Sequence, residues 1–219
     1  MFNKLALLTG AAALASFFGA VTAQADPSLT FDVTVWTAAT PNAQIGDASQ
    51  QALPTNPIIG AGNLMATATY TGIPNWFDSA QSSNTFAGFT NNEAGFSNIN
   101  YYNGGSGSSV LSTGNFGSVA LFELTFTTTH AFSGTVTHDD GFSLYDGTNQ
   151  LVNSAYPTNA TPTNFSVTPG TYNIWYLEAN GAPAELQFSN VNVPEPGSLA
   201  VLGTALVGLG LVLRRRKRA

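Results

Sequence analysis

The residues best suited to chemistry are two neighbouring carboxylates, Asp139 and Asp140, which close a predicted strand and precede Gly141. Adjacent carboxylates repel each other, and their hard oxygen atoms are the kind of ligand that Ca²⁺ prefers. The same Asp-Asp-Gly sequence is also typical of an ordinary turn. The pair therefore indicates either a cation site or a plain turn.

The positive charge of the chain is confined to its two ends, in Lys4, Arg214, Arg215, Arg216, Lys217 and Arg218. Residues 26–193 contain neither Lys nor Arg but hold eleven of the twelve acidic residues, so this span has a formal charge of −11 when its histidines are neutral. This argues against nucleic acid as a partner, because a phosphate backbone requires a basic surface. A clustered carboxyl group here must face water, accept hydrogen bonds, be protonated or hold a metal cation.

The chain has no cysteine, which removes disulfides, zinc–thiolate sites and cysteine nucleophiles together. Stability must then come from packing, and a span of about 165 residues is long enough for one compact core. Frequent Gly and Pro, sparse charge and abundant Thr, Asn and aromatic residues are typical of an exported all-β domain.

The segments that must position the acid pair alternate between apolar and polar residues. A strand at 132–138 leads into the pair, Phe142 and Leu144 alternate after it, and Asp146-Gly147 predicts a hairpin turn. Further strands are expected around Phe165, Tyr172 to Tyr176, and Leu186 to Phe188.

Earlier in the chain, alternation predicts strands at 29–35, 65–70 and 118–128, the last buried on both faces. Residues 71–117 hold short aromatic clusters in a polar background and are open to two interpretations. They form either short strands with long binding loops or peripheral additions to the fold with no role in binding. Helical periodicity is absent from 26 to 193. The sequence therefore predicts an all-β fold, a single antiparallel β-sandwich of the jelly-roll kind, over residues 26–192.

The first 25 residues have the pattern of a secretory signal peptide. Lys4 precedes an apolar stretch, and Ala23-Gln24-Ala25 supplies the small-x-small cleavage pattern. We expect the mature chain to begin at Asp26.

The last segment, residues 193–219, begins with Pro194-Glu195-Pro196, which cannot continue a strand. Sixteen largely apolar residues at 198–213 would span about 24 Å as a helix, short of the roughly 30 Å hydrocarbon core but workable with snorkelling arginines. The five basic residues at 214–218 (Arg214, Arg215, Arg216, Lys217 and Arg218) place this end in the cytoplasm. We therefore expect a C-terminal transmembrane helix that holds the exported domain at the membrane.

This order of Pro-Glu-Pro, short apolar helix and Arg-rich end closely resembles the PEP-CTERM sorting signal of Gram-negative bacteria. The resemblance implies processing by the membrane protease exosortase, export through the inner membrane, and a final place at the cell surface or outside the cell. It also implies an association with exopolysaccharide and with biofilm or floc matrix.

The segment from Phe122 to Phe188 resembles the second half of the sugar-binding β-sandwich family named after the anthrax protective antigen. The matching elements are the Asp139-Asp140-Gly141 motif, the Asp146-Gly147 turn, the Gly170-x-Tyr172 strand and the loop from Glu178 to Gly181. The resemblance implies that Asp139 and Asp140 are joined by a cis peptide and bind one calcium ion, with Asn180 as a further ligand. It also implies that vicinal sugar hydroxyls complete the coordination of that ion.

Two other readings of the site residues bear on function. Trp76, in a polar loop, is the best candidate to stack on a sugar ring, although tryptophan in a sandwich more often packs in the core.

Catalysis is disfavoured, because glycoside hydrolysis requires two carboxylates about 5 to 10 Å apart across a cleft and no nucleophile or phosphate-loop motif is present.

The sequence therefore predicts a non-enzymatic protein of the cell surface or extracellular matrix that binds exopolysaccharide with the help of calcium. The alternative is a structural matrix protein of the same fold with no small ligand, which adheres through its Asn/Ser/Thr-rich surface.

Overall fold

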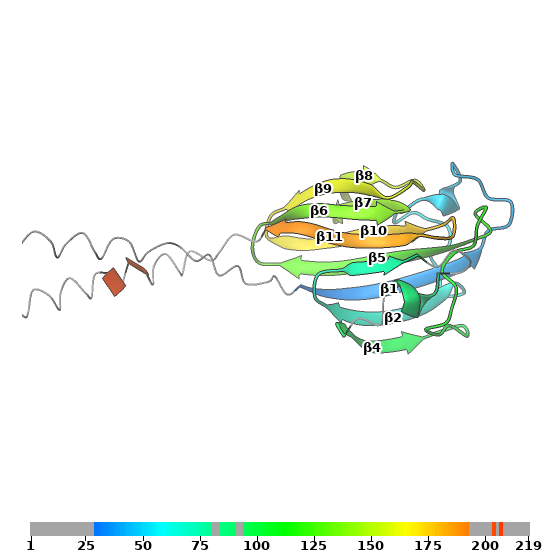
Figure 1. The fold of residues 1–219 in the computed structure, drawn as a ribbon, viewed down its shortest axis with the longest axis horizontal. Helices are drawn as coiled ribbons and strands as arrows, with labels where there is room; N and C mark the ends of the chain where they lie inside the picture. Colours follow the sequence, from blue (N-terminus) through cyan, green and yellow to red (C-terminus); the bar gives the residue numbers. More distant parts are fainter. Residues whose placement is uncertain (1–28, 80–83, 91–93, 193–202, 205, 208–219) are drawn as a thin grey trace, which may run out of the picture.

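The computed structural model describes residues 29–79, 84–90, 94–192, 203–204 and 206–207, and its strands form two antiparallel sheets (Figure 1). The first sheet has seven strands, in the spatial order β4 (Phe96–Tyr101), β2 (Leu64–Thr71), β1 (Thr30–Ala39), β5 (Ser118–Thr128), β10 (Gly170–Glu178), β7 (Gly141–Asp146) and β8 (Asn149–Ser154). The second has four, in the order β3 (Asn75–Asp78), β11 (Ala184–Asn192), β6 (Phe132–Asp139) and β9 (Thr161–Val167). The expected all-β fold with two antiparallel sheets is confirmed.

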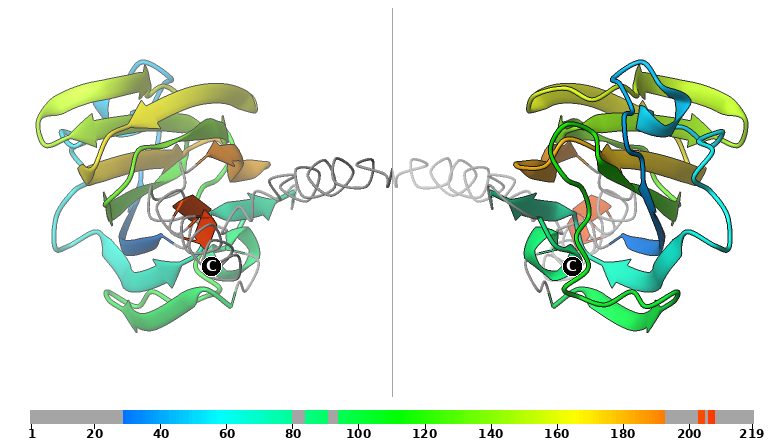
Figure 2. Two further views of the ribbon diagram at one scale, coloured as in Figure 1. Left: turned by 90° about the vertical axis from the view of Figure 1, so that its left-hand side faces the viewer. Right: turned by 90° about the vertical axis from the view of Figure 1, so that its right-hand side faces the viewer.

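Two short helices, η1 (Ala48–Gln50) and α1 (Phe86–Phe89), lie in the connections. Within the stretch that was open to two interpretations, the described residues form β3, α1 and β4. Figure 2 views the molecule from each end of its long axis and shows the strands in layers.

Alternation along the strands explains which faces are buried. On β1, Phe31, Val33 and Val35 are almost fully buried, and their neighbours Asp32 and Thr34 are not. These apolar side chains face the second sheet and join the main core. This alternation fixes the register of the strand, because a slip of one residue would turn the apolar side chains toward water.

Strand β5 is buried on both faces, as expected, because a second core covers the outer face of the seven-stranded sheet. Val119 and Leu121 pack there with Trp36 and Trp175, whose rings stack at 6.1 Å. Residues of the connection between β1 and β2, including Ala52 and Ile58, cover this cluster.

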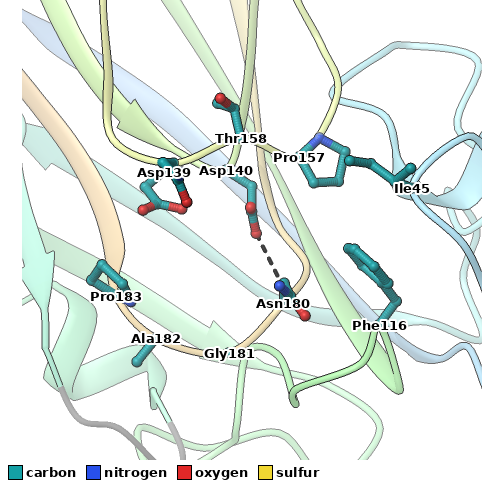
Figure 3. A pocket seen from close by; sticks show the side chains of 11 residues that line it. Ile45, Phe116, Asp139, Asp140, Pro157, Thr158, Asn180, Gly181, Ala182 and Pro183 are labelled. Carbon is teal, nitrogen blue, oxygen red and sulfur yellow. Dashed lines mark hydrogen bonds between the residues drawn. The ribbon is translucent and has the colours of Figure 1, made fainter.

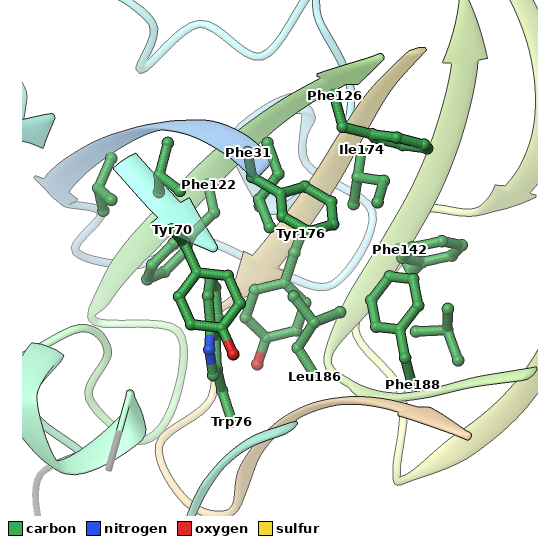
Figure 4. Close-up of a cluster of buried hydrophobic side chains, with 14 of the residues drawn as sticks. Phe31, Tyr70, Trp76, Phe122, Phe126, Phe142, Ile174, Tyr176, Leu186 and Phe188 are labelled. Carbon is green, nitrogen blue, oxygen red and sulfur yellow. The ribbon is translucent and has the colours of Figure 1, made fainter. Parts of the chain in front are cut away.

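Trp76 lies in the main core, so the prediction that it stacks on a ligand is wrong (Figure 4). It pairs with Leu186 in the β3–β11 ladder, which turns the indole toward the interior, and its exposed fraction is 0%. Its ring meets Tyr70 edge-on at 5.1 Å and Phe89 at 5.8 Å. The sequence around Trp76 is polar, but the pairing of the short strand β3 with β11 is enough to bury this side chain.

Several sequence expectations fall on residues outside the described ranges. These are the signal peptide at 1–25, the sorting segment from Pro194 to Pro196, the basic residues 214–218 and most of the apolar stretch 198–213. Among the helices that the structure does describe, none is both long enough and apolar enough to cross a membrane.

The strand directions separate the ends of the described sandwich from its acid pair. Strand β1 begins and β11 ends on the left of Figure 1, whereas β6 ends and β7 begins on the right. Asp139 and Asp140 therefore lie at the end of the sandwich opposite to Thr30 and Asn192.

We expect the substitution Trp76→Ala to lower the free energy of unfolding by about 3 to 5 kcal/mol, because it leaves a large cavity among aromatic rings. Denaturant unfolding of the purified protein measures this change. Tyr156→Ala is the matched control, since Tyr156 is 53% exposed and surface substitutions usually stay within about 0.5 kcal/mol. An equal effect of the two substitutions would contradict the core position of Trp76.

Candidate functional site

The acid pair lies at the point where the chain passes from one sheet to the other. Asp139 ends β6 in the four-stranded sheet, and Gly141 begins β7 in the seven-stranded sheet. The peptide bond between Asp139 and Asp140 is cis, as the resemblance implied. Both residues are mostly buried, with exposed fractions of 8% and 5%.

The two aspartates open into a pocket of about 360 Å³ at this end of the sandwich (Figure 3). Five separate segments line it, and their residues are Ile45, Phe116, Asp139, Asp140, Pro157, Thr158, Asn159, Asn180, Gly181, Ala182 and Pro183. In Figure 3 the apolar side chains of Ile45, Phe116 and Pro157 gather on one side, and Asp139 lies on the other with Asp140 between them. The pocket therefore has a carboxylate wall and an apolar wall.

Asp140 is held by the loop that follows β10. Its Oδ2 accepts hydrogen bonds from the backbone N–H groups of Ala179 at 2.8 Å and Asn180 at 3.1 Å. The Asp140 carbonyl accepts from Nδ1 of the buried His138 at 2.6 Å. Burial lowers the pKa of His138, which favours its neutral ring. Because a carbonyl oxygen can only accept, the hydrogen of this neutral ring lies on Nδ1, and Nε2 accepts from the Thr163 hydroxyl at 2.9 Å.

Burial shifts both aspartates toward the protonated form, and repulsion adds to the shift of Asp139. Burial first, then the charges of Asp140 and Glu185, raises the pKa of Asp139 to about 7. Burial likewise raises the pKa of Asp140 to about 6, although the N–H groups of Ala179 and Asn180 oppose that shift. Glu185 stands directly across the β6–β11 ladder from Asp139, and like charges in that position destabilise a sheet. A bound cation would offset both the burial of the charged carboxylates and the repulsion between them.

A third carboxyl group, Glu178, lies beneath the pocket in a closed polar network. Its Oε1 accepts from the Asn84 amide at 2.6 Å and from the Ser112 hydroxyl at 2.5 Å. The Ser112 hydroxyl oxygen in turn accepts from the backbone N–H of Gly181 at 2.9 Å, so the network also holds the pocket loop from below.

The hydroxyl of Tyr176 joins this network to the acid pair. It donates to the Asp139 carbonyl and also lies 3.1 Å from Oε2 of Glu178. Burial raises the pKa of Glu178 well above its usual range. This shift favours the protonated form of Glu178, and a proton on its carboxyl group would supply the hydrogen that a single tyrosine hydroxyl lacks.

The structure brings Asp139, Asp140 and Asn180 together around one pocket, as expected, and leaves Trp76 outside it. The side-chain oxygen of Asn180 accepts from the backbone N–H of Asn115 at 3.1 Å. Sequence reasoning missed Ile45, Phe116 and Pro157. These residues are far apart in the chain, and no periodic pattern connects them with the acids.

The donor set is oxygen-rich and small. In the described part of the chain, no three His, Cys, Asp or Glu side chains converge as a metal-binding group. Two carboxylates remain, and carboxylate, amide and carbonyl oxygens are what Ca²⁺ accepts as ligands. The chemistry of the pocket therefore fits a hard cation that retains open coordination positions.

A protein-family model for the PEP-CTERM protein-sorting motif matches residues 192–217. The predicted sorting signal is thereby confirmed. The motif implies export, processing by exosortase and a location in the cell envelope or at the cell surface.

Three solved structures are similar to this chain. The PA14 sugar-binding domain from an RTX adhesin shares 15% identity and has a TM-score of 0.48, with 77% of this chain and 91% of that chain covered. The PA14 domain of the antifreeze protein MpAFP shares 9% identity and has a TM-score of 0.47, with 77% and 85% covered. A family GH31 α-xylosidase from Xanthomonas citri shares 10% identity and has a TM-score of 0.30, with 78% and 24% covered. No curated protein matches the chain.

The raised pKa values predict that the protein without added cation loses stability as pH rises. The folded state holds protons on Asp139, Asp140 and Glu178 more tightly than the unfolded chain does. The stabilising contribution of the two aspartates is therefore full below about pH 4 and declines as pH rises through about 6 and 7. The melting temperature in a chelator should be higher at pH 5 than at pH 8.

The control for this prediction is the double substitution Asp139→Asn/Asp140→Asn, which removes the two aspartates from the titrating groups. We expect a shallower fall of the melting temperature over the same pH range. A melting temperature that rises steadily from pH 5 to pH 8 in the unsubstituted protein would contradict the assignment.

Proposed function

We propose that this exported surface protein binds neutral carbohydrate in the pocket at Asp139 and Asp140, with the help of a bound calcium ion. The observation that carries the proposal is a pair of buried, adjacent carboxylates that open into a pocket in a span with no Lys or Arg. Such a pair is held at a cost, because its repulsion has no basic partner to offset it. A divalent cation removes this repulsion, and the free energy that is thereby released favours binding of the cation.

The carboxylates of Asp139 and Asp140 would hold the ion. The backbone N–H groups of Ala179 and Asn180 already bind Oδ2 of Asp140, which fixes the direction of this carboxylate before any ion arrives. The sequence resemblance implied Asn180 as a further ligand. When bound, calcium would supply open coordination positions for sugar hydroxyls.

The charge of the domain favours a neutral glycan. Uronic or sulfated sugars would meet a span with a formal charge of −11 and no Lys or Arg to pair with them. A neutral sugar offers hydroxyls to the polar wall and ring C–H groups to Ile45, Phe116 and Pro157. Exopolysaccharide of a biofilm or floc matrix is the proposed natural source.

The position of the pocket suits a ligand outside the cell. The sorting motif begins at residue 192, at the end of the sandwich opposite to the pocket. Strands of nine residues, such as β10 and β11, are about 30 Å long. A chain attached to a membrane through that motif would therefore present the pocket away from the membrane.

We also propose that the protein is not an enzyme. Asp139 and Asp140 are adjacent on one wall, and the facing wall of the pocket is apolar. The pair of carboxylates that glycoside hydrolysis places on opposite sides of a scissile bond is thus not built at this pocket.

Titration of Ca²⁺ into the purified protein by calorimetry tests the proposal. We expect saturable binding and a rise in melting temperature, which corresponds to about 2.7 kcal/mol at a free concentration one hundred times Kd. Asp139→Ala/Asp140→Ala should abolish both effects. Asp146→Ala is the matched control, because Asp146 is an exposed acid at the other end of β7.

A glycan array with and without chelator then identifies the sugar. Chelator-sensitive signals from neutral glycans are expected. If several millimolar Ca²⁺ produces no heat of binding and no shift in melting temperature, the cation site is refuted. An array without glycan signals would favour the structural matrix role.

A further inference from the structure

Phe116 occupies a backbone conformation that aromatic residues rarely adopt. The chain reverses at residues 114–117, where the N–H of Gly117 donates to the carbonyl of Gly114 and Thr113 bridges to Ser118. The central residues Asn115 and Phe116 have φ values of 59° and 55°. Two successive positive φ values are what a type I′ hairpin turn requires.

The favoured residues for such a turn are Asn followed by Gly. This chain keeps Asn115 at the first central position but has a phenylalanine at the second. A bulky residue in the left-handed region is strained and persists only where its surroundings hold it there. Strain of this kind, at the wall of a pocket, points to a use for the side chain.

Hydrogen bonds from two other segments hold the turn in place. The side-chain oxygen of Asn180 accepts from the N–H of Asn115 at 3.1 Å. The hydroxyl of Thr40 donates to the carbonyl of Phe116 at 2.7 Å, and the N–H of Thr40 donates to the carbonyl of Gly117 at 2.9 Å. The turn is thus tied to the same loop that holds Asp140.

The strained conformation brings the phenyl ring to the apolar wall of the pocket (Figure 3). Phe116 is half-buried, with part of its ring against the second core and part at the pocket. Ile45 lies on the same wall and is 53% exposed. An apolar wall facing two carboxylates matches a sugar ring, which has an apolar face and a hydroxyl edge.

We propose that Phe116 is the platform on which the bound sugar ring stacks, and that Asn180 is a positioning residue that holds Phe116 in place rather than a cation ligand. This inference rests on the proposed carbohydrate function of the pocket. It gives the stacking role expected of Trp76 to a residue that lies in the pocket, and it gives the Asn180 side-chain oxygen a partner within the protein.

Three variants of the purified protein test the stacking role of Phe116 and the positioning role of Asn180: Phe116→Gly, Phe116→Trp and Asn180→Ala. Calorimetry measures the Kd of Ca²⁺ alone, and then of the methyl glycosides of glucose, galactose, mannose and fucose in saturating Ca²⁺. Melting temperatures are measured in parallel.

Phe116→Gly should weaken glycoside binding about three- to tenfold, the range expected for one aromatic contact, and leave the Kd of Ca²⁺ within about twofold. The melting temperature should not fall, because glycine suits this turn position. Phe116→Trp should keep glycoside binding and report it as a change in indole fluorescence. If Phe116 only fills the second core, Phe116→Gly will lower the melting temperature and leave glycoside affinity unchanged, which would overturn the platform.

Asn180→Ala should weaken glycoside binding by a similar factor and leave the Kd of Ca²⁺ within about twofold. A tenfold or greater rise in that Kd would instead identify Asn180 as a cation ligand and overturn the positioning role. If the unsubstituted protein binds Ca²⁺ but no glycoside or array glycan, the carbohydrate function fails and the platform fails with it. If it binds a glycoside and Phe116→Gly binds equally well, the platform alone fails.

Discussion

The structure of the pocket depends on one electrostatic constraint: buried carboxyl groups in a span that contains no Lys or Arg. Asp139, Asp140 and Glu178 are each shifted toward the protonated form, since burial penalises their charge and nothing basic compensates it. Hydrogen bonds take over the role that ion pairs have elsewhere. The surrounding loops are arranged to supply them, from the backbone at 179–181 and from the Asn84 and Ser112 side chains.

This constraint connects the pocket to the core. Tyr176 belongs to β10 and is packed among Phe89 and Phe122 in the main core, yet its hydroxyl contacts both the Asp139 carbonyl and Glu178. The acid pair also sits where the chain changes sheets. The packing of the two sheets therefore fixes the positions of the carboxylates, which is the arrangement that a preorganised binding site requires.

The sequence was informative where structure is local. Alternation located the strands that bear Phe31, Phe142 and Tyr172, and the motif around Asp139 placed both acids and Asn180 at one pocket. It failed where long-range pairing decides. Trp76 is buried because β3 adds to the edge of β11, more than one hundred residues later in the chain, and no local pattern records that pairing. The apolar wall eluded prediction for the same reason, and because the φ values at Phe116 contradict the usual preference of its residue type.

The departures from local rules are concentrated at one end of the molecule. Adjacent buried acids, like charges opposite each other at Asp139 and Glu185, and a phenylalanine in a left-handed turn all lower stability, and all lie at or beside one pocket. A protein selected for stability alone would carry a paired acid and a glycine at these positions. The opposite end, where the sandwich meets the sorting motif, carries a smaller irregularity: the β6–β11 register shifts between Ser189 and Asn192, and Asn190 has a φ of 51°, which asparagine tolerates better than phenylalanine. This asymmetry is the pattern expected when the large aromatic core supports an energetically costly site that a ligand stabilises on binding.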